Sequence, residues 1–214
     1  MSPLSKIIGL LQIDSTVGDL AGNAERLESL TAIAQANGAQ VAIATELAVC
    51  GYPPRDLLLQ PDFITTSFET AKNLAVEIPV LVGTPIPPDH ERNLPANGVV
   101  RAGVLQAVPN KDNTNRVVAK KQLLPSYDVF DETRYFTPAN RSGICRSIGE
   151  IDLGITICED AWQAAGLTPS AYGQDPVASL AEWGRQGVSL DATVNLSASP
   201  YHADKVGSRI KVCR

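Results

Sequence analysis

Short apolar runs alternate along the chain with stretches whose apolar residues recur at helical spacing. Residues 7–13 and 41–44 are apolar enough to form buried strands. Between them, apolar residues at 24, 27, 30, 33 and 34 share one face of a helix that begins after Asn23 and ends at Asn37-Gly38. This β-α-β order predicts two parallel strands joined by a right-handed crossover.

The alternation of strand-like and helix-like segments continues to the end of the chain. No internal repeat, low-complexity tract or linker interrupts it, so we expect one α/β domain over residues 1–214. Residues 50–56 hold too much Gly and Pro for a regular element, and residues 110–115 form a polar turn. Further helices are expected at 63–76 and 177–185, and further strands at 80–83, 99–108, 116–119, 151–158 and 192–196.

Composition narrows the class of protein. The chain has 214 residues, of which 44% are hydrophobic and 19% are charged, as in soluble globular domains. The net charge of −5 and the absence of any basic cluster longer than Lys120-Lys121 argue against nucleic-acid binding. The apolar runs are too short to cross a membrane, and no signal-peptide pattern follows Lys6. We therefore expect a cytoplasmic protein that binds no membrane.

The four cysteines, Cys50, Cys145, Cys158 and Cys213, form no C-x-x-C pair and have no metal-ligand spacing. In a reducing compartment they are expected to be free thiols. The two histidines, His90 and His202, lie in polar segments without an evident partner. A Cys-His protease and a protein-held metal are therefore disfavoured.

Three reactive side chains stand where apolar strands end: Glu46, Lys121 and Cys158. Sites in open α/β sheets form at such positions, because the strand is rigid and the following loop is free to shape a pocket. Each residue also has a plain structural interpretation. A cysteine that ends a strand is usually a small core residue, and a glutamate or lysine there usually lies on the surface. Physical reasoning alone leaves these three residues as candidates.

Two other groups of signals are weaker. The sequence contains neither G-x-x-x-x-G-K-[ST] nor G-x-G-x-x-G, so no loop for nucleotide phosphates is evident. Trp162 and Trp183 are expected to be packing residues.

Four segments resemble the signatures of one family, in its order, and together cover nearly the whole chain. The family is the nitrilase, or carbon-nitrogen hydrolase, superfamily, in the branch formed by the amidase domains of glutamine-dependent NAD(+) synthetases. Residues 46–58 resemble its first signature and residues 121–136 its second. Residues 154–162 resemble its nucleophile signature, and residues 195–205 its glutamine-contact segment. The segments read Glu-Leu-Ala-Val-Cys-Gly-Tyr-Pro-Pro-Arg-Asp-Leu-Leu, Lys-Gln-Leu-Leu-Pro-Ser-Tyr-Asp-Val-Phe-Asp-Glu-Thr-Arg-Tyr-Phe, Gly-Ile-Thr-Ile-Cys-Glu-Asp-Ala-Trp and Asn-Leu-Ser-Ala-Ser-Pro-Tyr-His-Ala-Asp-Lys.

The resemblance implies a role for each of the three candidates. Cys158 would attack the side-chain amide of L-glutamine and form a thioester, which releases ammonia. Glu46 would be the general base that takes the thiol proton and later activates water. Lys121 would offset the carboxylate beside the thiol and stabilise the tetrahedral oxyanion. Glu132 matches a second glutamate that orients the site.

The resemblance also implies how substrate is held and how the chain folds. Tyr127, Ser199 and Lys205 match glutamine-binding positions, and Lys205 is suited to the substrate's α-carboxylate. The implied fold is a four-layer α-β-β-α sandwich with two mixed sheets in the middle and helices outside. Proteins of this kind usually form large homo-oligomers, so a homo-oligomer is expected.

Two features depart from the family's pattern. The ATP-binding signature Ser-Gly-Gly-x-Asp-Ser is not in the sequence. We therefore expect a domain without its own cofactor, while ATP, Mg²⁺ and deamido-NAD(+) would belong to an absent synthetase domain. Family members also continue past the last matched block with a helix and further strands, and residues 206–210 fit that helix poorly. The domain is therefore expected to be truncated and to lack its last strands. Residues 94–115 are also irregular against the family's pattern.

The leading interpretation is the glutaminase portion of a glutamine-dependent NAD(+) synthetase, which supplies ammonia for amidation of deamido-NAD(+). A second interpretation is a free-standing carbon-nitrogen hydrolase that acts on another amide. A third is an inactive truncated remnant or a partner subunit that keeps the site residues without catalysis.

Overall fold

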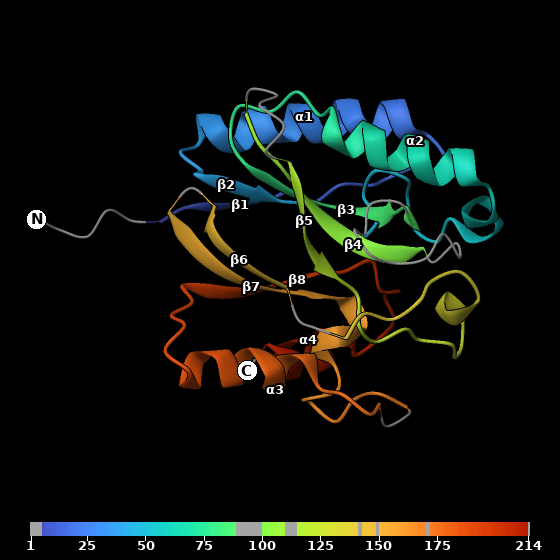
Figure 1. The fold of residues 1–214 in the computed structure, drawn as a ribbon, viewed down its shortest axis with the longest axis vertical. Coiled ribbons are helices and arrows are strands. Elements are labelled where there is room, and N and C mark those ends of the chain that lie inside the picture. Colours follow the sequence, from blue (N-terminus) through green and yellow to red (C-terminus); the bar gives the residue numbers. More distant parts are fainter. Residues whose placement is uncertain are drawn as a thin grey trace, which may run out of the picture.

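Two β-sheets lie face to face in the computed structural model, with helices outside both of them (Figure 1). The structure describes residues 6–88, 100–109, 115–140, 143–148, 150–169 and 172–213. Helices α1 (Leu20–Ala36) and α2 (Pro61–Lys72) cover the first sheet, and α3 (Pro176–Arg185) and α4 (Lys205–Val212) lie beyond the second. The predicted α-β-β-α sandwich is confirmed.

The first sheet is mixed. Its strands are neighbours in chain order: β1 (Ile8–Leu10), β2 (Val41–Ile43), β3 (Val80–Ile86), β4 (Arg101–Ala107) and β5 (Arg116–Lys120). Strands β1, β2 and β3 are parallel, while β4 runs antiparallel to both β3 and β5. The predicted β-α-β unit is therefore present, with α1 between two parallel strands.

The second sheet is also mixed and contains one strand that the sequence pattern does not predict. Its order is β6 (Gly143–Ile148), β7 (Ile151–Ile157) and β8 (Ala192–Leu196). Strand β7 is antiparallel to β6 and parallel to β8. The apolar residues of β6 are interrupted by Arg146 and Ser147, so no clear period marks it as a strand.

The boundaries of two helices differ from the prediction. Helix α1 begins three residues before Asn23, because Asp19 is the N-cap and its carboxylate accepts a hydrogen bond from Gly22 N at 3.0 Å. Asn23 is instead buried and donates from Nδ2 to the carbonyls of Thr16 and Val49. Helix α2 ends at Lys72, short of residue 76.

The poor helical fit expected for residues 206–210 is wrong, because these residues form most of α4. None of the helix's residues is buried, and Val206 and Ile210 are exposed. Gly207 and the β-branched residues Val206, Ile210 and Val212 have low helix propensity, which explains the weak signal. Residues 94–99 and 110–114, which include most of the expected polar turn, lie outside the described residues.

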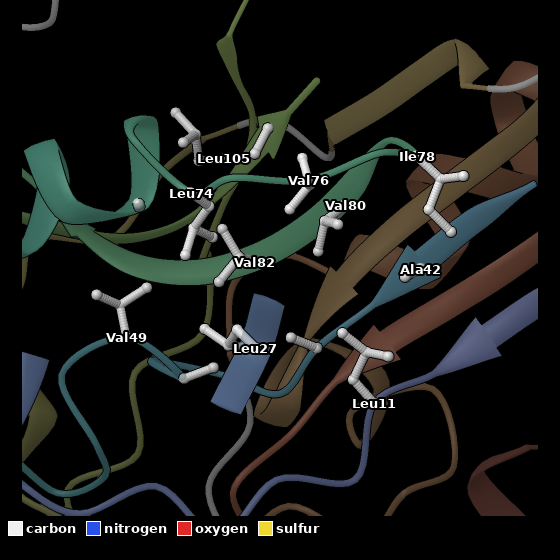
Figure 2. Close-up of a cluster of buried hydrophobic side chains, with 14 of the residues drawn as sticks. Leu11, Leu27, Ala42, Val49, Leu74, Val76, Ile78, Val80, Val82 and Leu105 are labelled. Carbon is white, nitrogen blue, oxygen red and sulfur yellow. The ribbon is translucent and has the colours of Figure 1, made fainter. Parts of the chain in front are cut away.

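The buried apolar side chains form layers that fix the two sheets. One cluster joins α1 and α2 to the outer face of the first sheet, with Leu27, Phe68 and Val82 among its members. Figure 2 shows Leu27 and Val82 in this cluster. A second cluster lies between the sheets and brings Leu81 of β3 together with Leu153 and Ile155 of β7. Burial of this second cluster holds the strand ends of one sheet over those of the other.

Candidate active site

Glu46 lies in a turn three residues after the end of β2 and is buried. The turn packs backbone to backbone against β3. A Cβ atom on Gly83 would lie 2.3 Å from the backbone nitrogen of Leu47, closer than atoms can approach. Leu47 itself has a positive φ of 49°. The glycine therefore allows the close approach that fixes the Glu46 turn on the sheet.

Lys121 follows β5, and its side chain is fully buried between two carboxylates. Its Nζ donates to Glu46 Oε1 at 2.6 Å and to Glu132 Oε1 at 2.7 Å. Tyr52 donates its hydroxyl to Glu132 Oε1 at 2.8 Å. The other oxygen of Glu46, Oε2, accepts from the backbone nitrogen of Ala198 at 3.2 Å. The Glu46 carboxylate thus joins the Lys121 ammonium to the segment that follows β8 of the second sheet.

Cys158 stands at the end of β7, in the first position of a 3₁₀ turn, Cys158–Ala161. Its φ of 46° is unusual for a residue with a side chain and turns the thiol out of the line of the strand. Asn195 Nδ2 donates to the Cys158 carbonyl at 3.2 Å, and Ser197 Oγ lies 3.5 Å from Sγ. Strand β8 therefore holds the nucleophile candidate from the side.

Charges in the cluster act on the thiol in opposite directions. Burial raises the pKa of Cys158 well above its ordinary value, and the Glu46 carboxylate raises it further, while Lys121 lowers it. Burial alone would lower the pKa of Lys121, but Glu46, Cys158 and Glu132 raise it well above its ordinary value. The amine is therefore an ammonium and the resting thiol is protonated at neutral pH. A nucleophile in this state needs a base to take its proton.

The pKa of the Glu132 carboxyl is set by burial and by two neighbouring charges. Burial raises its pKa to about 7, against the lowering effect of Lys121, and the Glu46 carboxylate raises it as well. Two carboxylates share one ammonium, so they cannot both be fully compensated. The pKa of Glu132 therefore lies close to neutral pH.

A cavity of about 240 Å³ opens over the thiol. Its lining includes Cys158 together with Tyr127, Ser199 and Lys205, which are the residues predicted to bind substrate. The structure therefore brings together all seven predicted site residues: three in the buried cluster, three in the cavity wall and Cys158 between them.

Glu159 is a site residue that sequence reasoning missed. It is buried in the cavity wall directly after Cys158. Its carboxylate accepts hydrogen bonds from the hydroxyls of Tyr127 at 2.8 Å and Tyr172 at 3.2 Å. The pair Glu159-Asp160 right after an apolar strand was the available signal, because buried carboxylates are rare unless they have partners.

Trp162 also lines the cavity, so its expected role in packing is incomplete. The Nζ of Lys205 lies 4.3 Å from the centre of the Trp162 ring, in cation–π contact. Trp183, by contrast, is 37% exposed on α3 and lines none of the described cavities.

The remaining thiols and histidines form no second centre among the residues that the structure describes. Cys50, Cys158 and Cys213 are free, and Cys213 is exposed. His202 is exposed and lies at the cavity rim, while His90 falls outside the described residues. No group of three His, Cys, Asp or Glu side chains in the described part could hold a metal ion. No described helix is long and apolar enough to pass through a membrane.

The chain is similar to curated enzymes over almost all of its length. It is 38% identical over 203 residues to the glutamine-dependent NAD(+) synthetase of Synechocystis and 34% identical over 206 residues to that of Thermotoga maritima. Each match includes 92% of this chain but only 35% and 31% of the relative. The chain thus spans about a third of the length of these relatives. No family model matches it.

Solved structures share the fold. A glutamine-dependent NAD(+) synthetase from Acinetobacter baumannii matches 94% of this chain with a TM-score of 0.71 and 24% identity, over 34% of its own chain. An amidase of the nitrilase superfamily from Nesterenkonia matches 93% of this chain with a TM-score of 0.63 and 17% identity, over 67% of its own chain. At these identities the likeness establishes the nitrilase-like sandwich.

Proposed function

We propose that this chain, a homologue of the N-terminal domain of glutamine-dependent NAD(+) synthetases, is a glutaminase that works through a Cys158 thioester. One observation carries the proposal. The thiol lies at the floor of a cavity, and Glu46 and Lys121 act on it electrostatically from the buried cluster beneath. A thiol, a base and a fixed cation are the groups that amide hydrolysis through a thioester requires.

In the first half of the reaction Glu46 takes the proton of the Cys158 thiol as the sulfur attacks the carboxamide carbon of glutamine. The ammonium of Lys121 stabilises the oxyanion of the tetrahedral intermediate. The carbon–nitrogen bond then breaks, and Glu46 returns its proton to the leaving nitrogen, which departs as ammonia. The product is a γ-glutamyl thioester on Cys158.

In the second half a water molecule gives a proton to Glu46 and attacks the thioester carbonyl. The carbon–sulfur bond breaks, and the sulfur recovers a proton from Glu46. Glutamate leaves, and the thiol is restored. Glu132 supports both halves, because its contact with Lys121 holds the ammonium in place while Glu46 gains and loses protons.

Opposite charges in the cavity wall suit the two ends of an amino acid. The Glu159 carboxylate is placed to receive the α-ammonium of glutamine, and its tyrosine partners fix its orientation. Lys205 is placed to receive the α-carboxylate, with Ser199 and Tyr127 as additional polar contacts. A simple uncharged amide would offer no opposite charge to either side chain, so L-glutamine is the substrate that the wall favours.

The relatives' name supports a destination for the ammonia. A glutamine-dependent NAD(+) synthetase needs ammonia to amidate deamido-NAD(+), and an ATP-using synthetase partner or domain would perform that step. The same resemblance supports a cytoplasmic homo-oligomer. Sedimentation velocity of the purified protein tests the oligomer.

Ammonia release from glutamine is the direct test, with asparagine, glutaramide and acetamide as competing amides. We expect release from glutamine, its loss in Cys158→Ala, and wild-type release in Cys213→Ala, which removes an exposed thiol instead. Turnover of acetamide but not glutamine would identify a hydrolase of another amide. A folded protein that releases no ammonia from any of the four would contradict an enzymatic role.

A further inference from the structure

The carboxylate of Asp160 receives three backbone hydrogen bonds that come from two separate segments. Oδ1 accepts from Gln122 N at 3.0 Å and from Leu123 N at 2.8 Å. Oδ2 accepts from Ile157 N at 3.1 Å. Gln122 and Leu123 directly follow Lys121, and Ile157 directly precedes Cys158. One side chain thus joins the two segments that carry the cation and the thiol.

Each of the joined segments also has hydrogen bonds of its own to other parts of the fold. The backbone of Lys121 is tied to the first sheet through Ala102, and that of Cys158 to β8 through Asn195. Cys158 also holds a φ of 46°, a conformation that surrounding contacts must maintain. Asp160 is 1% exposed, so its acceptor oxygens are shielded from bulk solvent.

We infer that Asp160 is a positioning residue, which sets the distance between the Cys158 thiol and the Lys121 ammonium across the two sheets. The inference rests on the proposed glutaminase function for its kinetic consequence. The role requires a carboxylate: only a group with two acceptor oxygens can serve N–H donors at both ends. It does not touch substrate, because Asp160 is absent from the lining of the cavity over Cys158.

The substitution Asp160→Asn separates positioning from simple packing. Asparagine has the same shape but one acceptor oxygen, so its NH₂ group faces either Ile157 N or the Gln122 and Leu123 pair. One of the two segments then loses its tie while the buried volume stays the same. Displacing reacting groups by about 1 Å can lower a rate by about 100-fold, and substrate binding in the cavity is untouched.

The matched control is Asp191→Asn. Asp191 accepts from Asp152 N at 2.9 Å and from Lys6 Nζ at 2.6 Å, at the opposite end of the same strand β7. Both variants and the wild type are assayed for kcat and KM with glutamine, for thermal unfolding, and for amide hydrogen exchange of residues 119–124 and 155–158.

We expect Asp160→Asn to lower kcat by about 10- to 100-fold with little change in KM, and to speed exchange in one or both segments. Asp191→Asn should keep wild-type kcat. Wild-type kcat in Asp160→Asn, or an equal loss of kcat in the control, would overturn the positioning role. If the wild type itself releases no ammonia from glutamine, the proposed function fails. Unchanged amide exchange in both segments of Asp160→Asn would contradict the positioning role of Asp160, whether or not the protein is a glutaminase.

Discussion

The Lys121 side chain is a completely buried ammonium whose partners, Glu46 and Glu132, are also buried. Removing one member of such a cluster leaves a buried charge without an opposite charge beside it. We predict that Lys121→Met abolishes ammonia release and lowers the free energy of unfolding by about 3–5 kcal/mol, because two carboxylates then lack a counter-charge. Urea unfolding measures the change in stability.

The control for this prediction is Lys6→Met. Lys6 pairs with Asp191 on the surface, where the Lys6 side chain is 45% exposed. The loss of such a pair should change the free energy of unfolding by about 1 kcal/mol or less. If both substitutions lowered the free energy of unfolding equally, the buried cluster would contribute no more than an exposed salt bridge.

Asp160 gives stability a particular dependence on pH. Burial raises its pKa from 3.8 to about 7, although the Leu123 N–H and Lys121 lower it. The folded protein therefore holds this proton more tightly than the unfolded chain does. The stability that it contributes is fully present below pH 3.8 and is lost as the pH rises through about 7.

Relative to Asp160→Asn, the wild type should therefore become less stable as the pH rises from about 4 to 7, and the difference should level off above that. Urea unfolding of both proteins at several pH values measures this difference. A difference that stays constant with pH, or that changes in the opposite direction, would show that the carboxylate is not penalised by burial.

At the scale of elements, α4 places Lys205 against the ring of Trp162, which follows the nucleophile turn. A cation–π contact of this kind contributes about 0.5–2 kcal/mol. We predict that Trp162→Leu raises the KM for glutamine by about 2- to 30-fold with little change in kcat, because Lys205 loses its support. Steady-state kinetics with glutamine test this.

Trp183→Leu on α3 is the comparison, since that ring is partly exposed and away from the cavity. It should leave both constants unchanged. A Trp162→Leu enzyme with normal KM and reduced kcat would instead place Trp162 beside the reacting atoms.

Some helices and strands could be predicted from the sequence pattern, and others could not. Strands β3, β4, β5, β7 and β8 are rich in apolar and β-branched residues, and their positions follow from that pattern. Strand β6 lacks such a pattern and forms through its pairing with β7, while α4 contains residues of low helix propensity. The predicted start of α1 after Asn23 was wrong because Asp19 caps the helix instead.

The residues of the candidate site likewise fall into those that the sequence identified and those that it did not. Glu46, Lys121 and Cys158 stand at strand ends, so their positions along the sequence marked them as candidates. Their family resemblance then supplied Glu132 and the three cavity residues. Glu159 and Asp160 were not predicted from the sequence. Glu159 bonds to Tyr127 and Asp160 to Leu123, and each of these partners lies more than 30 positions away along the chain.

At the scale of the whole molecule, the site is assembled from both sheets. Glu46 and Lys121 extend from the first sheet, while Cys158 and Ala198 belong to segments of the second. The apolar cluster between the sheets, with Leu81 and Leu153, is what keeps these segments at a fixed separation. Geometry at the site therefore depends on packing far from the substrate cavity.

This shared construction has a consequence for the order of events during folding. The Lys121–Glu46 bond closes a separation of 75 residues, and the Ala198–Glu46 bond one of 152. Contacts so distant in sequence form slowly compared with local helix formation. After dilution from denaturant, far-UV circular dichroism should therefore recover before Cys158 becomes reactive toward a glutamine-analogue electrophile. The thiol would act as a built-in reporter that the two sheets have docked.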